Sequence, residues 1–121
     1  MRKASILLVE DEGLIRLMLA EMVHDLGHLI VSEAANIETA MSLAEAQSFD
    51  LALLDVNLAG SIVTPVVRVL DRRRIPIVFV SGYSNTTLPA ELRGRLLVQK
   101  PVSQDALLAA INCAIGQTPA A

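Results

Sequence analysis

The chain is poor in cysteine, in aromatic residues and in long apolar runs. Its 121 residues include one cysteine, Cys113, so no disulfide can form within it, as is usual in a reducing compartment. Two phenylalanines, one tyrosine and no tryptophan leave the core to aliphatic side chains. No apolar run approaches the ~18 residues of a membrane-spanning helix, and the N-terminal segment lacks the small-residue cleavage site of a signal peptide. We therefore expect a cytoplasmic protein without a membrane segment.

Positive charge is also scarce. Ten Lys and Arg residues stand against thirteen Asp and Glu residues, for a net charge of -3. This composition lacks the basic footprint that non-specific nucleic-acid binding needs, so we expect no nucleic-acid partner. The length fits one domain over residues 1–121, with a core at about 4–116 and a polar tail at 117–121. On this reading no output domain follows.

Short β-type apolar runs alternate with apolar residues at helical spacing. The predicted strands are residues 4–9, 29–32, 51–54, 75–80 and 95–99. Helical stripes are found within residues 15–26, 37–44, 63–70 and 107–115, with Asn36 and Ser103 as N-caps. Residues 85–93 contain a proline and only two large apolar residues, which predicts a short or frayed helix. Continuous apolar strands are typical of sheets buried on both faces, so we expect an α/β fold with a doubly wound, five-stranded parallel sheet.

Polar residues follow four of these strands directly. Glu10 and Asp11 follow the first strand, Asp55 the third, Ser81 the fourth and Lys100 the fifth. Because parallel strands end at one edge of a sheet, these side chains are expected to converge there. Three close carboxylates need a counter-charge, and an oxygen-rich pocket without Cys or His suits Mg²⁺ or Mn²⁺.

The same residues suggest a chemical reaction. A carboxylate beside a bound dication can attack phosphorus and form an aspartyl phosphate, which would be the role of Asp55. Lys100 and the Ser81 hydroxyl would then neutralise and bind the oxygens of the transferred group. The sequence thus predicts phosphoryl transfer to Asp55.

The stretches "LLVEDE", "LALLDVN", "VFVSGY" and "LVQKP" resemble the receiver domain of bacterial two-component response regulators. The resemblance covers about residues 4–116 and implies a flavodoxin-like sheet of strand order 2-1-3-4-5. It implies that Asp55 is the phosphoacceptor, and that Asp11, Asp55 and the backbone carbonyl of Asn57 hold the metal, with Glu10 supporting it through water. It also implies that Ser81 is the switch hydroxyl, that Lys100 is the family's lysine, and that the peptide bond before Pro101 is cis.

The sequence departs from the common receiver pattern in two places. The Pro-Gly turn that usually follows the phosphoacceptor is absent, and Leu97 replaces the aromatic residue that usually switches on activation. Phe79 to Tyr83 resemble instead a branch of single-domain receivers with a Phe-x-Thr/Ser-Gly-Tyr signature, whose partners are HWE-type histidine kinases and whose fourth helix is often poorly ordered. We hypothesise that Tyr83 takes the role of the missing aromatic switch.

The predicted function is that of a stand-alone receiver rather than an enzyme, although it would assist its own phosphorylation and dephosphorylation. A histidine kinase or phosphotransferase would supply the phosphoryl group. The output would be a phosphate relay, a phosphate sink, or protein contact through the fourth helix, fifth strand and fifth helix, a region that contains Leu88, Leu92 and Leu97.

Three alternatives remain open. An aspartyl-phosphate phosphatase would need a second carboxylate where Asn57 stands. A pseudo-receiver that never binds phosphate is disfavoured by the complete acidic, hydroxyl and lysine set. A flavin or nucleotide binder would need a glycine-rich loop after the first strand, where three acidic residues are found instead.

Overall fold

A five-stranded parallel sheet forms the centre of the protein, in a computed structural model that describes residues 3–82 and 88–116. The strands are β1 (Ser5–Val9), β2 (Leu29–Ala34), β3 (Leu51–Asp55), β6 (Ile77–Ser81) and β7 (Leu97–Gln99). Their order across the sheet is β2-β1-β3-β6-β7, and every neighbouring pair is parallel. Numbered along the chain, this is the order 2-1-3-4-5, so the predicted fold class is confirmed.

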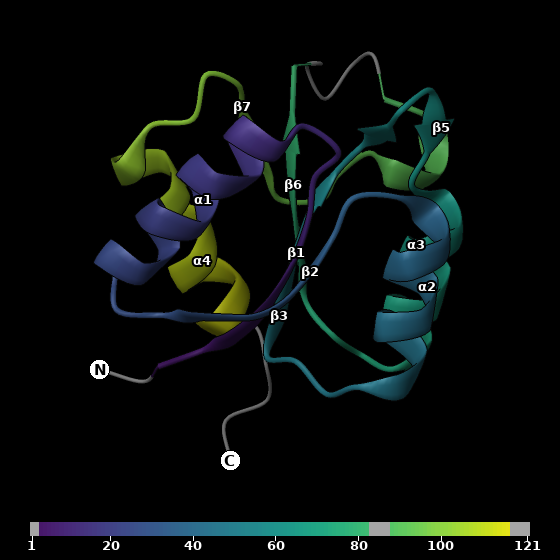
Figure 1. The fold of residues 1–121 in the computed structure, drawn as a ribbon, viewed down its shortest axis with the longest axis horizontal. Helices are drawn as coiled ribbons and strands as arrows, with labels where there is room; N and C mark the ends of the chain where they lie inside the picture. The colour runs from purple at the N-terminus through teal and green to yellow at the C-terminus, as the bar shows by residue number, and fades with distance from the viewer. Residues whose placement is uncertain (1–2, 83–87, 117–121) are drawn as a thin grey trace.

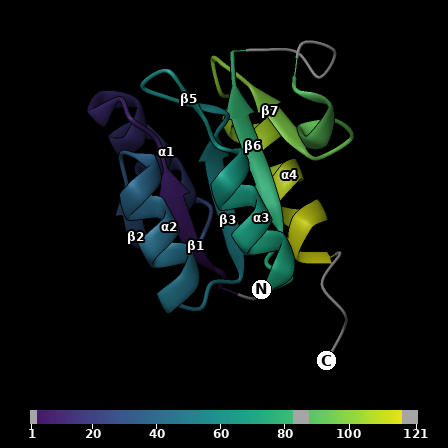
Figure 2. The same cartoon turned by 90° about the vertical axis from the view of Figure 1, so that its right-hand side faces the viewer.

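Helices cover both faces of the sheet. They are α1 (Gly13–Asp25), α2 (Ile37–Ala46), α3 (Thr64–Arg72) and α4 (Gln104–Gly116). In Figure 1 the sheet is seen nearly edge-on, with α1 and α4 on one side and α2 and α3 on the other. Figure 2 shows α2 and α3 lying across the sheet face. No helix in the described ranges is both long and apolar enough to cross a bilayer.

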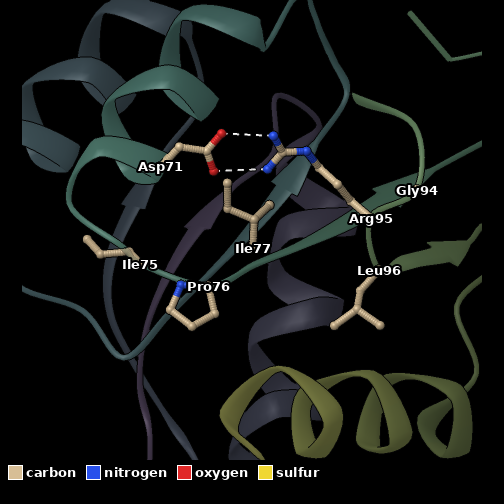
Figure 3. Close-up of a pocket in the computed structure, with 7 residues that line it drawn as sticks. All are labelled: Asp71, Ile75, Pro76, Ile77, Gly94, Arg95 and Leu96. Carbon is tan, nitrogen blue, oxygen red and sulfur yellow. Dashed lines mark hydrogen bonds and ion pairs between the residues drawn. The ribbon is translucent and has the colours of Figure 1, made fainter. Parts of the chain in front are cut away.

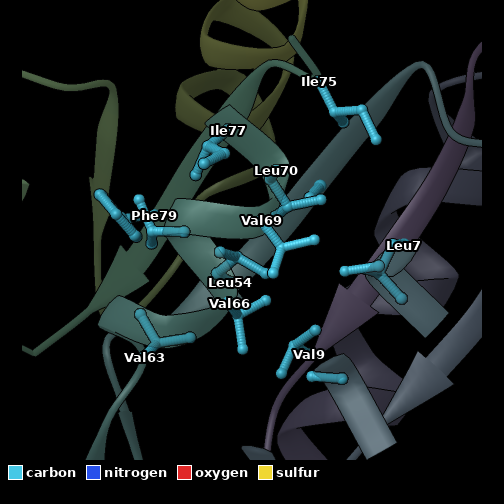
Figure 4. Packing of buried hydrophobic residues seen from close by; sticks show 14 of the residues in the cluster. Leu7, Val9, Leu54, Val63, Val66, Val69, Leu70, Ile75, Ile77 and Phe79 are labelled. Carbon is cyan, nitrogen blue, oxygen red and sulfur yellow. The ribbon is translucent and has the colours of Figure 1, made fainter. Parts of the chain in front are cut away.

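The aliphatic core is divided in two by the sheet. Leu7, Leu54 and Phe79 pack against α2 and α3 in the cluster of Figure 4. Leu8 and Leu53, their neighbours along the strands, pack on the opposite face against α1 and α4. Successive strand residues point to opposite faces, and in the three central strands nearly all of them are buried, which explains why these strands read as unbroken apolar runs. In the edge strand β2, by contrast, Leu29 and Val31 are each 43% exposed.

Local capping agrees with the sequence at two helix starts. The Asn36 side chain accepts a hydrogen bond from the Thr39 amide at 2.8 Å, and the Ser103 hydroxyl accepts one from the Ala106 amide at 3.1 Å. Each cap satisfies a backbone donor that has no partner within its helix. The predicted N-caps of α2 and α4 are therefore confirmed.

The segment between β6 and β7 contains a short helix, as predicted, but its large apolar residues are buried. Within its described part, the chain forms only a 3₁₀ turn, Ala90–Leu92. Leu88 and Leu92 are 1% and 0% exposed in the core beside α3, so their assignment to a contact face was wrong. With only these two large apolar residues, the segment buries both within one turn against the core instead of forming an amphipathic helix. Tyr83 lies outside the described residues.

A small antiparallel hairpin follows β3 and was not predicted. It consists of β4 (Asn57–Leu58) and β5 (Ser61–Ile62). Ala59 and Gly60 connect the two strands with φ of 50° and 91°, and positive φ at both central residues is what a two-residue type I′ hairpin turn requires. The hairpin occupies the place of the missing Pro-Gly turn, at the edge of the sheet where the predicted site residues lie.

Candidate functional site

The predicted site residues converge at the carboxyl edge of the sheet. Glu10 and Asp11 follow β1, Asp55 is the last residue of β3, Ser81 is the last of β6, and Lys100 follows β7. These strands end together at the upper edge of the sheet in Figure 1. All of these residues except Glu10 line a hollow of about 330 Å³, together with Glu12, Asn57, Ala59, Gly60 and Gly82.

Lys100 connects the carboxylates of two strands. Its Nζ lies 3.1 Å from Glu10 Oε1 and 3.1 Å from Asp55 Oδ2. Burial alone would lower the pKa of Lys100, but the ion pairs with Glu10 and Asp55 together raise it. The lysine is therefore held in its charged form beside the carboxylate that is predicted to accept the phosphoryl group.

Glu10 is the most unusual titratable group of the site. Its side chain is fully buried, and this desolvation raises its pKa from 4.5 to about 7. A hydrogen bond from the Glu12 amide at 3.1 Å and the Lys100 ammonium oppose the shift, whereas the charge of Asp55 adds to it. Perturbed carboxylates of this kind are concentrated at functional sites, because folding alone gives no reason to bury an acid among other acids.

The acidic cluster fits a hard dication. One oxygen from each of Glu10, Asp11 and Asp55 lies within 4.8 Å of the other two. The buried Glu10 Oε1 forms an ion pair with Lys100 Nζ at 3.1 Å and has no other partner among the described residues, so it retains capacity for a further electropositive partner. Carboxylate oxygens are the donors that Mg²⁺ and Mn²⁺ prefer.

Backbone groups and one arginine hold the carboxylates in place. The Ala59 amide donates to Asp11 Oδ2 at 3.1 Å, and the Asn57 amide donates to Asp55 Oδ1 at 3.3 Å. Arg16 donates from Nη1 to the Glu10 carbonyl at 2.9 Å and from Nε to Glu33 Oε1 at 3.1 Å. Sequence reasoning missed Arg16. Arg16 lies in the first turn of the helix that follows the acidic pair, and this position could have identified it as a neighbour of Glu10.

Ser81 and the Lys100–Pro101 bond complete the site. Ser81 is 1% exposed, and its carbonyl accepts a hydrogen bond from the Lys100 amide at 2.8 Å, which joins the ends of β6 and β7. The Lys100–Pro101 peptide bond is cis, the isomer that the resemblance implies. The hydroxyl and the ammonium therefore come from adjacent strands and line the same hollow.

A second hollow, of about 440 Å³, lies at the opposite end of β6 (Figure 3). Asp71 and Arg95 form a two-fold ion pair across it, at 2.9 and 2.8 Å, above the apolar side chains of Ile77 and Leu96. Because the two charges already neutralise each other and none of the site residues in the described part of the chain lines it, this hollow adds nothing to the chemistry of the carboxylates.

Comparisons with known proteins point to one family. The response regulator receiver domain family matches residues 6–112. The transcriptional regulatory protein PdtaR of Mycobacterium tuberculosis is 33% identical in an alignment of 116 residues, and the match covers 93% of this chain and 57% of PdtaR. The chain thus spans little more than half the length of that curated relative.

Solved structures agree with the family match. SdrG from Sphingomonas melonis Fr1 has a TM-score of 0.83 and 35% identity, over 95% of this chain and 99% of SdrG. The receiver domain of the PhyR response regulator from Erythrobacter litoralis has a TM-score of 0.84 and 29% identity, over 98% of this chain and 96% of that domain.

Proposed function

Because the chain belongs to the response regulator receiver domain family, we propose that it accepts a phosphoryl group on Asp55 from a histidine kinase or a phosphotransferase. The observation that supports this most strongly is the contact of 3.1 Å between Lys100 Nζ and Asp55 Oδ2, in a hollow that also contains Asp11 and Ser81. Asp55 is 8% exposed and lines this hollow beside Lys100, so a phosphodonor could reach its carboxylate.

The proposed reaction is a phosphoryl transfer between side chains. An Asp55 oxygen attacks phosphorus, so an O–P bond forms while the N–P bond of the donor's phosphohistidine breaks and the imidazole retains that electron pair. Lys100 balances the charge of the incoming oxygens, and the Ser81 hydroxyl donates to one of them. These groups would also assist phosphorylation by small donors and the later hydrolysis.

The metal would be held by Glu10, Asp11 and Asp55 together with the Asn57 carbonyl. Receiver domains generally bind Mg²⁺, and at this site Mg²⁺ or Mn²⁺ would neutralise the negative charge that otherwise repels a phosphodonor. Of the three carboxylates, Asp55 is the one that both pairs with Lys100 and lines the hollow with Ser81. Glu10 and Asp11 would therefore serve the reaction through the metal and its charge balance.

The surface beside the site favours a protein donor. On α1, Leu14, Leu17 and Met18 are 73%, 56% and 51% exposed, which is unusual for large apolar side chains on one helix. A groove of about 360 Å³ continues this patch between Ile15, Met22 and the Lys100–Val102 segment. A protein that brings a phosphohistidine to Asp55 must cover this neighbouring surface, so we assign this surface to the donor and propose an HWE-type histidine kinase as that donor.

The output is proposed to be protein contact or phosphate relay. The contact face would consist of the segment before β7, of β7 itself and of α4. Leu88 and Leu92 in that segment are buried and would not be part of the face. Leu97, on β7, is only partly buried and stays within that face. Ser81 would report phosphorylation to this face because its strand pairs directly with β7.

The test is intact-mass measurement after incubation with Mg²⁺ and a small acyl phosphate. Wild type is expected to gain one phosphoryl group that hydroxylamine removes, whereas Asp55→Asn gains none. Asp105→Asn, at an exposed acid in the first turn of α4, is the control and should be phosphorylated like wild type. An adduct on Asp55→Asn would remove Asp55 from its role, and no adduct on wild type with either a small donor or a kinase would favour a pseudo-receiver.

A further inference from the structure

The β4–β5 hairpin contacts the candidate metal site directly. The Ala59 amide, in the turn of the hairpin, donates a hydrogen bond of 3.1 Å to Asp11 Oδ2. The two residues are 48 positions apart in the sequence and meet only because β1 and β3 are neighbours in the sheet. A carboxylate with one oxygen held by a backbone amide has its rotation restricted, so this contact sets where the other oxygen points.

The position of the Ala59 amide depends in turn on the Asn57 side chain. The Gly60 amide donates to Asn57 Oδ1 at 2.8 Å, which closes the turn across its two positive-φ residues. Positive φ is unfavourable for a residue with a Cβ, so the turn conformation at Ala59 needs compensating contacts. The hairpin is anchored by Leu58, which lies beside the turn and is 2% exposed, and at its base by the hydrogen bond from the Val63 amide to the Val56 carbonyl at 2.9 Å.

We propose that the Asn57 side chain is a positioning residue for the metal site, because it holds the Ala59 amide against Asp11 and thereby orients that carboxylate toward the cation. The inference rests on the proposed function, and it concerns the side chain of Asn57, not the backbone carbonyl that the family resemblance assigns to the metal. The half-buried Asn57 side chain lines the hollow, so the carboxylate, the amide and the turn form one continuous contact.

Asn57→Leu tests the inference, since leucine has a similar size and leaves the backbone carbonyl in place but cannot accept the bond from Gly60. Mg²⁺ binding is measured by calorimetry without any phosphodonor, and exchange of the Ala59 amide with solvent is measured by NMR. The variant is expected to raise the dissociation constant for Mg²⁺ about ten-fold, as loss of an outer-shell contact does, and to speed exchange of the Ala59 amide.

Two further variants separate the possible results. Asn57→Ser keeps a neutral acceptor and should return the dissociation constant to within about three-fold of wild type, because a serine hydroxyl forms the same type of turn more weakly. Asp11→Asn should abolish tight Mg²⁺ binding while leaving the fold intact by circular dichroism.

An unchanged dissociation constant in Asn57→Leu would overturn the inference and leave the proposed function standing. The same holds for weakened Mg²⁺ binding with an Ala59 amide that is still protected, because Asn57 would then act by another route. Failure of the wild type to bind Mg²⁺ at all would overturn both.

Discussion

Replacement of Glu10 by glutamine should stabilise the metal-free protein at alkaline pH and weaken its binding of Mg²⁺. The Glu10 carboxylate is fully buried, and burial raises its pKa to about 7 from 4.5. The folded state therefore binds the Glu10 proton more tightly than the unfolded state does. The contribution of this proton to the free energy of unfolding is fully present below pH 4.5 and is lost as the pH rises through 7.

The size of the effect follows from the same two pKa values. At pH 8 the ionised Glu10 costs about 3 kcal/mol relative to its neutral form, at 1.36 kcal/mol for each pKa unit. At pH 5 the cost is about 1 kcal/mol or less, because most of the group is still protonated in the folded state. Glutamine imitates the neutral form at every pH, so the advantage of Glu10→Gln should grow between pH 5 and pH 8.

Urea unfolding, followed by far-ultraviolet circular dichroism in the presence of a chelator, measures this difference. For a domain of this size, about 3 kcal/mol corresponds to a shift of the midpoint by about 1–3 M urea. Glu21→Gln, at an exposed acid on α1, is the control and should show no comparable growth of its effect with pH. Excess Mg²⁺ should reduce the difference at pH 8, because ligand binding stabilises wild type more than the variant.

The reasoning would be refuted by a Glu10→Gln variant that is less stable than wild type at pH 8, or whose advantage is the same at pH 5 and pH 8. The first result would show that the ion pair with Lys100 outweighs the desolvation of the carboxylate, and the second would show that folding does not raise the pKa of Glu10.

Two further predictions concern the surface and the core. Leu17→Ser, at a side chain that is 56% exposed, should slow phosphorylation by a protein donor about ten-fold and leave phosphorylation by a small acyl phosphate unchanged, because only the protein covers α1. Equal effects on both donors would contradict the docking assignment. Leu92→Ala should lower the free energy of unfolding by about 2–5 kcal/mol, since Leu92 is 0% exposed in the α3 core. A loss in urea unfolding as small as that of a surface substitution would place Leu92 on the surface instead.

The site could be predicted from the sequence because its residues occupy strand ends. Apolar runs mark where each strand stops, and parallel strands all end at one edge, so Asp55 and Lys100 were expected to be neighbours before any distance was known. Contacts that depend on a backbone amide could not be foreseen in this way. The hydrogen bond from the Ala59 amide to Asp11 requires a turn with positive φ at two successive residues. The sequence around Asn57 did not predict this turn.

The segment before β7 shows the other limit of sequence reasoning. Leu88 and Leu92 are four residues apart, a spacing that fits both one face of an exposed helix and a single turn folded into the core. Whether they were buried depended on the free volume beside α3, which is a property of packing and not of local spacing.

By itself, the amino-acid sequence determined which chemical groups this protein has, where the four strands that carry the site end to within one residue, and that its sheet must be covered on both faces. Only the tertiary structure decided that Lys100 Nζ lies 3.1 Å from both Glu10 and Asp55, and that burial brings the pKa of Glu10 to about 7. The physical reason is that electrostatic interaction and desolvation depend on distances between atoms and on the exclusion of water. For residues tens of positions apart, both are set by how strands and helices pack.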